Sequence, residues 1–317
     1  MLARVAELYY LRGWDQRAIA EEIGTSRSNV SRLLTEARRR GIVEIRINRP
    51  LGRNRDLEHQ LVEQMGIQEA RILTIRKGLW TEDPLQQVGS IAARYLEEHL
   101  TDGLSIGVSQ GTSLDAMIDG IVSAGSYAVE IVQLLGGLQF ISADLSGHEI
   151  GRRLAERLGG TFYYLHAPAI VDSPETKDAL IRQPGIADTL RRAASVDIAF
   201  VGVGALGVGT SKALWAEAFL TKQEQHEIAA SKAVGDVCAR LFDIEGNPCK
   251  VSVDQRVVGI ELGALKKIPK VVAVARGPEK GAGLLGALRG GYVNVLISDE
   301  PTARRVLKLD QQTRLAS

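Results

Sequence analysis

Residues 16–35 read QRAIAEEIGTSRSNVSRLLT, a stretch that predicts two short helices joined by a tight turn. Apolar residues recur at helical spacing on one face of each helix. Gly24 stands between the helices, where glycine can end a helix in the left-handed conformation without a Cβ penalty. Thr25 or Ser26 then caps the second helix. This is the spacing of a helix-turn-helix, with inward residues Ile19, Ala20, Ile23, Val30, Leu33 and Leu34.

The outer face of the second helix carries polar and basic side chains. Arginine, serine and asparagine can bond base edges or phosphate oxygens in a DNA major groove. A bare helical hairpin is the alternative, and this polar face argues against it. Residues 3–11 add an amphipathic helix that would complete a three-helix core. We therefore expect DNA contacts from Ser26, Arg27, Ser28, Asn29, Ser31 and Arg32.

A strand is expected directly after this module. Residues 43–48 alternate apolar and polar side chains, which is the pattern of a half-buried strand. A strand in this place would be the wing of a winged helix-turn-helix. Arg38, Arg39 and Arg46 would then contact backbone phosphates and add an affinity that falls with salt. A solvated basic helix end is a compatible interpretation of the first two.

Charge is distributed unevenly along the chain. The 317 residues are 45% hydrophobic and 24% charged, as in ordinary soluble globular proteins, and this length favours about two domains. Residues 1–50 carry ten arginines and six acidic residues, whereas the rest carries 29 basic and 32 acidic residues. A basic head on a mildly acidic body suits a phosphate-binding module attached to a domain with another task.

Nothing in the sequence indicates a metal site or export. Cys238 and Cys249 are the only cysteines, and they lack a clustered His or Cys partner, so neither a zinc site nor a disulfide framework is expected. No apolar run approaches the roughly 18 residues of a membrane span, and no signal peptide pattern follows Met1. We expect a cytoplasmic protein without a metal or cofactor.

The remainder of the chain predicts an α/β fold. Residues 51–66 have the pattern of a linker helix that is a candidate to pair with its copy in a dimer, and residues 67–317 alternate short apolar runs with helical stretches. Such runs indicate parallel strands buried on both faces, that is, a doubly wound, Rossmann-like sheet. The expected domains are a winged helix-turn-helix over residues 1–50, the linker helix, and an effector-binding and oligomerisation domain.

Ligands of doubly wound folds bind at the carboxyl ends of the strands. The loop Gly107–Ser113 directly follows the strand predicted over residues 104–108 and opens a helix. Its glycines, its hydroxyls and the helix N-terminus offer hydrogen-bond donors to an anion. The loop matches neither a Walker A loop nor a dinucleotide fingerprint. We therefore expect it to bind a ligand of another kind.

Other strand-end segments add weaker candidates. Gly136 follows a predicted strand, and so do Gly202 and Gly204, for which a tight strand exit is the simpler interpretation. Asp236 is a candidate to bond a hydroxyl-rich ligand. Lys280 stands at or near a helix start and is a candidate phosphate contact or counter-ion.

Several motifs, in the order in which they occur along the chain, resemble those of a known protein family. The chain resembles the SorC family of bacterial sugar-responsive transcriptional regulators over nearly its whole length. Members pair a winged helix-turn-helix with an effector domain similar to ribose-5-phosphate isomerase and glucosamine-6-phosphate deaminase. The resemblance implies a homodimer or homotetramer whose operator binding changes when a sugar, sugar phosphate or polyol is bound. The motifs are LYYLRGWDQRAIAEEIGTSRSNVSRLLTEARRRGIVEI, GVSQGTSL, LHAPAIVDSPE, GDVCARLFDIEGNP, VDQRVVGIEL and GPEKGAGLLGALRGGYVNVLISDE.

The resemblance also implies a set of effector contacts. Two positions depart from the family pattern, because members often have an aromatic or charged residue in place of Gln110 and a different residue in place of Glu261. A carboxylate at position 261 would repel a phosphate, so an uncharged sugar or polyol stays open beside a sugar phosphate. The implied contacts are Ser109, Gln110, Gly111, Thr112, Ser113, Asp236, the stretch from Arg256 to Glu261, and Lys280.

An enzyme is the alternative function, because the second domain is similar to sugar isomerases. Isomerisation needs a base and an acid near the substrate carbonyl. His148, His166 and His226 lie in separate motifs, and no Asp/His/Glu set stands out in the strand-end loops. With a DNA-binding head in the same chain, we expect no catalysis. A third possibility is a constitutive DNA-binding protein whose α/β domain only oligomerises.

Overall fold

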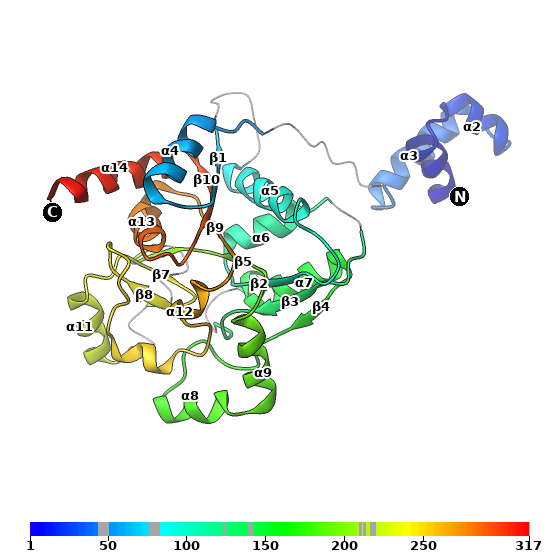
Figure 1. Ribbon diagram of the computed structural model, residues 1–317. Helices are drawn as coiled ribbons and strands as arrows, with labels where there is room; N and C mark the ends of the chain where they lie inside the picture. Colours follow the sequence, from blue (N-terminus) through cyan, green and yellow to red (C-terminus); the bar gives the residue numbers. More distant parts are fainter. Residues whose placement is uncertain are drawn as a thin grey trace. The chain divides into compact units, whose positions relative to one another are not determined.

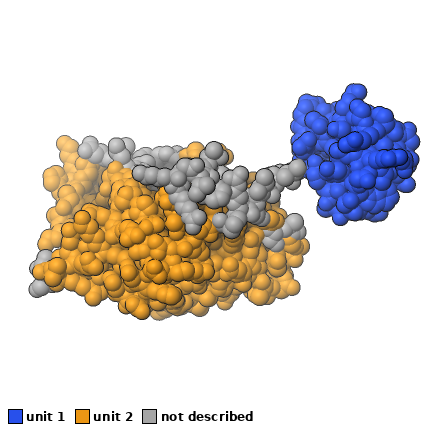
Figure 2. All heavy atoms as spheres, turned by 90° about the horizontal axis from the view of Figure 1, so that it is seen from above, with its two compact units in different colours: residues 1–50 blue, residues 51–317 orange. Residues whose placement is uncertain are grey.

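The computed structural model describes residues 1–43, 51–75, 83–122, 125–138, 142–208, 211, 214–215 and 220–316. The chain divides into two compact units, Met1–Pro50 and Leu51–Ser317, which are coloured separately in Figure 2. No helix in these described ranges is long and apolar enough to cross a membrane.

The first unit is a small helical module. Helix α1 (Leu2–Ala6) continues into η1 (Glu7–Leu11), and α2 (Gln16–Glu22) and α3 (Arg27–Arg39) follow. Gly24 has a φ of +66° and turns the chain between α2 and α3. The two predicted helices are confirmed, and the hydroxyl of Ser26 caps α3 by accepting from the Asn29 amide at 3.2 Å. The core consists of Val5, Leu8, Ile19, Ala20, Val30 and Leu34. The predicted wing, with Arg46, falls on residues 44–50, outside the described residues.

The second unit contains a sheet of seven parallel strands (Figure 1). The strand order is β1-β10-β9-β5-β2-β3-β4, and all six neighbouring pairs are parallel. Six of these strands coincide with the apolar runs that predict strands, ARILTI, LSIGV, VEIVQLL, DIAFVGV, KVVAVA and VNVLIS, while β4 was not predicted. The strands are β1 (Glu69–Leu73), β2 (Ser105–Val108), β3 (Glu130–Gln133), β4 (Thr161–Tyr163), β5 (Ile198–Val201), β9 (Lys270–Val274) and β10 (Val295–Asp299).

Helices cover both faces of this sheet. Along β9, Val271 and Ala273 belong to one hydrophobic cluster, and Val272 and Val274 belong to the other. Successive side chains of a strand point to opposite faces, so the two clusters are the two faces of a doubly wound fold, as predicted. One face is covered by α5 (Pro84–Glu97), α6 (Thr112–Asp119) and α7 (Gly147–Leu158); the other by α4 (Arg55–Met65), α9 (Pro184–Ala193), α12 (Leu262–Leu265), α13 (Gly281–Arg289) and α14 (Glu300–Ala316).

Helix α4 is the helix that the sequence predicts between the two domains. Its apolar stripe packs within the chain, because Leu57 and Leu61 are buried in the same cluster as Ile72 of β1. Asn54 caps the helix by accepting from the Leu57 amide at 3.1 Å, and Gly66 ends it in the left-handed region. The helix therefore forms part of the second unit, and its pairing with a second copy stays a prediction.

A small antiparallel sheet stands beside the main one. It joins β6 (Gly204–Ala205), β7 (Gly235–Val237) and β8 (Arg240–Phe242). The turn between β7 and β8 consists of Cys238 and Ala239, which have φ values of +49° and +60°. Two further helices of this unit are α8 (Pro174–Ile181) and α11 (Lys222–Ala230).

The chain order of the main sheet reverses between β2 and β5. From β2 the chain adds β3 and β4 outward on one side, and from β5 it adds β9 and β10 on the other. Loops that leave two such neighbouring strands diverge, which opens a crevice at their carboxyl ends. The loop Ser109–Ser113 follows β2, and Gly202–Gly204 follows β5.

Candidate functional site

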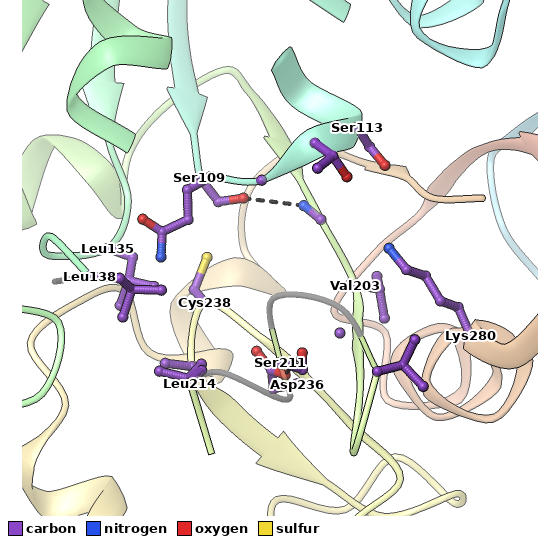
Figure 3. A pocket seen from close by; sticks show the side chains of 17 residues that line it. Ser109, Ser113, Leu135, Leu138, Val203, Ser211, Leu214, Asp236, Cys238 and Lys280 are labelled. Carbon is purple, nitrogen blue, oxygen red and sulfur yellow. Dashed lines mark hydrogen bonds between the residues drawn. The ribbon is translucent and has the colours of Figure 1, made fainter. Parts of the chain in front are cut away.

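A cavity of about 80 Å³ lies at this reversal of strand order (Figure 3). Such a volume holds roughly five water-sized groups, which suits a small ligand. The loops after β2, β3 and β5, the β7–β8 hairpin and the start of α13 all contribute to its wall. The lining residues are Ser109, Gln110, Gly111, Thr112, Ser113, Leu135, Leu138, Gly202, Val203, Gly204, Val208, Ser211, Leu214, Asp236, Cys238, Ala239 and Lys280.

The loop after β2 forms one wall. Ser109 is buried, and its hydroxyl accepts from the Gly202 amide at 3.1 Å, the contact drawn as a dashed line in Figure 3. Gly111 has a φ of +114° and precedes α6, which has no side-chain cap. The first amides of a helix lack partners within the helix, so α6 presents N–H donors beside the hydroxyls of Thr112 and Ser113. This wall is suited to an anionic or oxygen-rich group.

Gln110 connects this wall to a neighbouring helix. Its side-chain oxygen accepts from the Gly147 amide, at the start of α7, at 3.4 Å. The Gly111 amide donates to the Leu145 carbonyl at 3.1 Å, just before the same helix. The loop is therefore held from both sides, by the β5 exit and by the approach to α7.

Asp236 forms the opposite wall from β7. It is buried, and one of its oxygens, Oδ1, accepts from the Ser211 hydroxyl at 2.7 Å and from the Trp215 indole N–H at 3.2 Å. Burial raises the pKa of the Asp236 carboxyl above its ordinary value, although the two hydrogen bonds and the charge of Lys280 act in the opposite direction. At Gly204, a Cβ would lie 1.8 Å from Ser211 Oγ and 2.2 Å from Asp236 Oδ1, so only glycine fits beside this carboxylate.

Lys280 stands at the N-terminus of α13, and Figure 3 shows its side chain on the same side of the cavity as Ser113. Its ammonium has no hydrogen-bond or ion-pair partner within the described part of the chain. Burial lowers the pKa of Lys280, and the nearby carboxylates of Glu279 and Asp236 raise it. An incompletely solvated ammonium without a partner is suited to a ligand that supplies oxygen atoms.

The turn of the β7–β8 hairpin closes the cavity floor. Cys238 and Ala239 are both buried and both adopt positive φ values, which is unusual for residues other than glycine, asparagine and aspartate. Backbone strain of this kind is found at binding sites more often than elsewhere. Burial, together with the charge of Asp236, raises the pKa of the Cys238 thiol to about 12, so the thiol stays protonated.

Three predicted site residues do not line the cavity. Gly136 lies in the loop after β3, where a larger residue would not fit, because an added Cβ would lie 2.5 Å from the Pro168 carbonyl oxygen. Arg256 forms a two-point ion pair with the buried Glu224, at 2.9 and 2.8 Å. Glu261 is exposed and accepts at 2.6 Å from Arg240 of β8, whose own side chain is buried.

The cavity also has members that the sequence did not single out. Ser211 holds the carboxylate of Asp236, and the glycine pair 202 and 204, interpreted from sequence as a strand exit, lines the wall. The pair of glycines that follows β5 is the sequence signal for this part of the wall. For Ser211 and the apolar lining residues Leu135 and Leu138, no sequence pattern points to the site.

The three histidines weighed for catalysis lie outside the lining. Two of them, His148 and His166, pack against the ring of Tyr164, edge-on and tilted, with centroid distances of 5.2 and 3.7 Å, and His226 lies on α11. Within the described ranges, no group of three or more His, Cys, Asp or Glu side chains has the arrangement of a metal site.

In the first unit, the predicted DNA-contact residues lie on α3 and its ends. Asn29 is half-buried, and its side-chain amide donates to the Thr25 hydroxyl at 2.8 Å. Arg39 pairs with Glu36 at 2.6 Å, and the arginines beside this carboxylate lower its pKa to about 2. The remaining predicted contacts in the described residues are exposed: Ser26, Arg27, Ser28, Ser31, Arg32 and Arg38.

The chain is similar to known regulators along almost its full length. A family model described as "Putative sugar-binding domain" matches residues 49–308. The sorbitol operon regulator of Klebsiella pneumoniae is 30% identical over 310 residues, which cover 97% of this chain and 98% of that protein. The crystal structure of full-length SorC from the same organism superposes with a TM-score of 0.73 and 28% identity, covering 96% of this chain and 98% of that one.

The chain belongs to the SorC family. A second relative, the deoxyribonucleoside regulator of Bacillus subtilis, is 32% identical over 305 residues, which cover 95% of each protein. The resemblance seen in the sequence is thereby confirmed. This SorC-family chain is a transcriptional regulator, in which a helical head precedes a Rossmann-like sugar-binding domain.

Proposed function

We propose that a sugar, sugar phosphate or polyol bound in the cavity controls the affinity of this regulator for its DNA operator. One observation supports this most strongly. The buried carboxylate of Asp236 and the ammonium of Lys280, which has no partner among the described residues, border one small cavity at the strand ends of a chain that carries a helix-turn-helix. Burying charged groups without hydrogen-bond partners costs free energy, and a hydroxyl-rich molecule can form hydrogen bonds with both the carboxylate and the ammonium.

The walls suit different parts of such a molecule. The Asp236 carboxylate accepts hydrogen bonds from ligand hydroxyls, while Lys280 and the amides at the start of α6 bind an oxygen-rich or anionic group. The names of two relatives point to a polyol, sorbitol, and to the deoxyribose of a deoxyribonucleoside. The proposed effector contacts are Ser109, Gln110, Gly111, Thr112, Ser113, Gly204, Asp236 and Lys280.

Control of DNA binding requires two states of the protein. We propose a homodimer or homotetramer in the cytoplasm, in which two α3 helices enter successive major grooves about 34 Å apart or a multiple of that distance. The effector shifts the equilibrium between the states only by its differential affinity for them. DNA contacts come from Arg27, Ser28, Asn29, Ser31 and Arg32, with Arg38 on the phosphates.

A sugar isomerase is the alternative, and the described lining residues favour binding over catalysis. The candidates for proton transfer there are Asp236, Cys238 and Lys280. The carboxylate of Asp236 already accepts two hydrogen bonds, and the thiol of Cys238 stays protonated. Incubation with pentose and hexose phosphates, in the absence of DNA, distinguishes the two functions, because turnover would establish the enzyme.

The proposal is tested with the full-length chain in two steps. A thermal-shift screen with sorbitol, 2-deoxyribose, sorbitol 6-phosphate and 2-deoxyribose 5-phosphate should give at least one rise in melting temperature. Fluorescence anisotropy should then show that this probe changes the affinity for a duplex selected from a randomised pool. Gly204→Ala, which fills the space beside Asp236, should lose the thermal shift. Absence of any thermal shift or of any effect on DNA affinity contradicts the proposal.

A further inference from the structure

The first residues of the second unit are fastened to the edge of its main sheet. Leu51 is the first residue of this unit, so the covalent connection to the DNA-binding head enters here. Arg53 forms an antiparallel bridge with Leu73 of β1. The Asn54 amide donates to the Ile72 carbonyl at 2.8 Å, and the Thr74 amide donates to the Gly52 carbonyl at 2.8 Å. Residues 52–54 thus pair with the β1 edge through an isolated antiparallel bridge.

An ion pair between Arg53 and the buried Glu58 holds this segment in place. Arg53 donates twice to Glu58 of α4, at 2.7 and 2.9 Å, and also to the Ala70 carbonyl at 3.3 Å. Glu58 is buried, and it accepts from the Ile72 amide at 2.9 Å as well. Because both side chains also bind β1, a displacement of β1 is transmitted to residues 52–54.

A series of hydrogen bonds connects the cavity to β10, the strand that pairs with β1. The Lys280 amide donates to the Gly277 carbonyl at 3.0 Å, and the Gly277 amide donates to the Thr302 hydroxyl at 2.8 Å. That hydroxyl in turn donates to the carboxylate of Asp299, which also accepts from the Thr302 amide at 3.1 Å. Thr302 and Asp299 are buried, so neither group exchanges these partners for water.

The two sets of contacts meet at a single residue. In the parallel pairing of β10 with β1, Asp299 stands opposite Leu73, and Leu73 is the residue bridged to Arg53. Lys280 of the cavity is therefore connected to the entry point of the head through Gly277, Thr302, Asp299, Leu73 and Arg53, and each step is a hydrogen bond or a strand pairing.

We propose that Thr302 and Arg53 are positioning residues of a relay that links effector binding at Lys280 to the segment that carries the DNA-binding head. This inference rests on the proposed function and describes how effector binding in the cavity would change DNA binding by the head. When an effector draws the Lys280 ammonium toward the cavity, the turn at Gly277 shifts with it. The single hydroxyl of Thr302 both accepts from Gly277 and donates to Asp299, so it passes the shift to β10. Strand pairing then passes it through β1 to residues 52–54.

Thr302→Val tests the relay because valine keeps the shape and removes both hydrogen bonds of the hydroxyl. Thr302→Ser keeps the hydroxyl and should behave as the wild type. Asp310→Asn is the control, since Asp310 is, like Thr302, a buried polar residue of α14 but pairs with Arg289 away from the relay. Arg53→Met interrupts the relay at its other end. Because the Arg53 side chain is partly exposed, this variant tests the relay even if Thr302→Val fails to fold.

The readout is hydrogen exchange in the full-length chain, with and without sorbitol, 2-deoxyribose, sorbitol 6-phosphate or 2-deoxyribose 5-phosphate. In the wild type, the probe that raises the melting temperature should change deuterium uptake over residues 51–58 at least about twofold, and DNA affinity about fivefold or more. In Thr302→Val and Arg53→Met both changes should disappear, while the thermal shift by the probe and DNA binding without it persist.

The outcomes separate the relay from the proposed function. If the wild type responds and both variants respond equally to it, the relay is wrong and the proposed function stands. If the wild type shows no thermal shift and no change in DNA affinity with any of the four probes, the proposed function fails, and the relay fails with it. A loss of response in Asp310→Asn as large as in Thr302→Val would mean that any buried change in α14 has this effect, and would overturn the relay.

Discussion

Replacing Arg256 should destabilise the protein without weakening effector binding. Its guanidinium makes two hydrogen bonds to Glu224, at 2.9 and 2.8 Å, and the two side chains are only 12% and 6% exposed. Removing one partner of a buried ion pair leaves an uncompensated charge and costs about 3–5 kcal/mol. For domains of this size each kcal/mol lowers the melting temperature by about 2–4 °C, so Arg256→Ala should melt about 6–20 °C lower.

Differential scanning fluorimetry with and without the best sugar probe measures both quantities. The thermal shift by the probe should persist in Arg256→Ala, because Arg256 does not line the cavity. Adding Glu224→Gln should recover part of the lost stability, because it removes the unpaired charge. Arg304→Ala, which breaks an exposed pair with Glu300, is the control and should cost at most about 1 kcal/mol. An Arg256→Ala protein with wild-type melting and no probe response would refute this reasoning.

Three further predictions concern the two functional surfaces. Arg27→Ala should weaken operator binding by about 1–3 kcal/mol, roughly 5- to 150-fold by anisotropy, and leave the probe-induced thermal shift unchanged. Gly204→Ala should abolish that shift, because its Cβ would overlap Ser211 and Asp236, while DNA binding without probe persists. Burial lowers the pKa of Lys280, so its ammonium costs stability below the folded pKa, and the cost vanishes as pH rises through the ordinary value of 10.5. Lys280→Met should therefore melt higher than the wild type at pH 7 without probe, and a melting series should show this advantage shrinking toward pH 10.5.

Much of the fold could be predicted because its signals are local. The helix-turn-helix depends on Gly24, on the Ser26 cap and on apolar spacing, all within twenty residues. The six predicted strands are largely apolar runs, which is what burial on both faces requires. The missed strands, β4 and β6–β8, have two or three residues each, too short for any periodicity.

The site was harder to predict because distant segments build it. The loop at Ser109–Ser113 was found from its place after a strand, and Asp236 and Lys280 from their motifs. Ser211 could not be found, since its role arises only when β7 brings Asp236 beside it. Arg256 lies in a family motif, yet its guanidinium contacts Glu224, a partner that sequence spacing does not reveal.

The central claim is that a small hydroxyl-rich molecule in the strand-end cavity changes the affinity of the helical head for DNA. The most direct measurement is the affinity of the full-length chain for its selected duplex, at probe concentrations that saturate the thermal shift. The account predicts a change of about fivefold or more in the wild type and none in Gly204→Ala. Equal affinities with and without a saturating probe would contradict it.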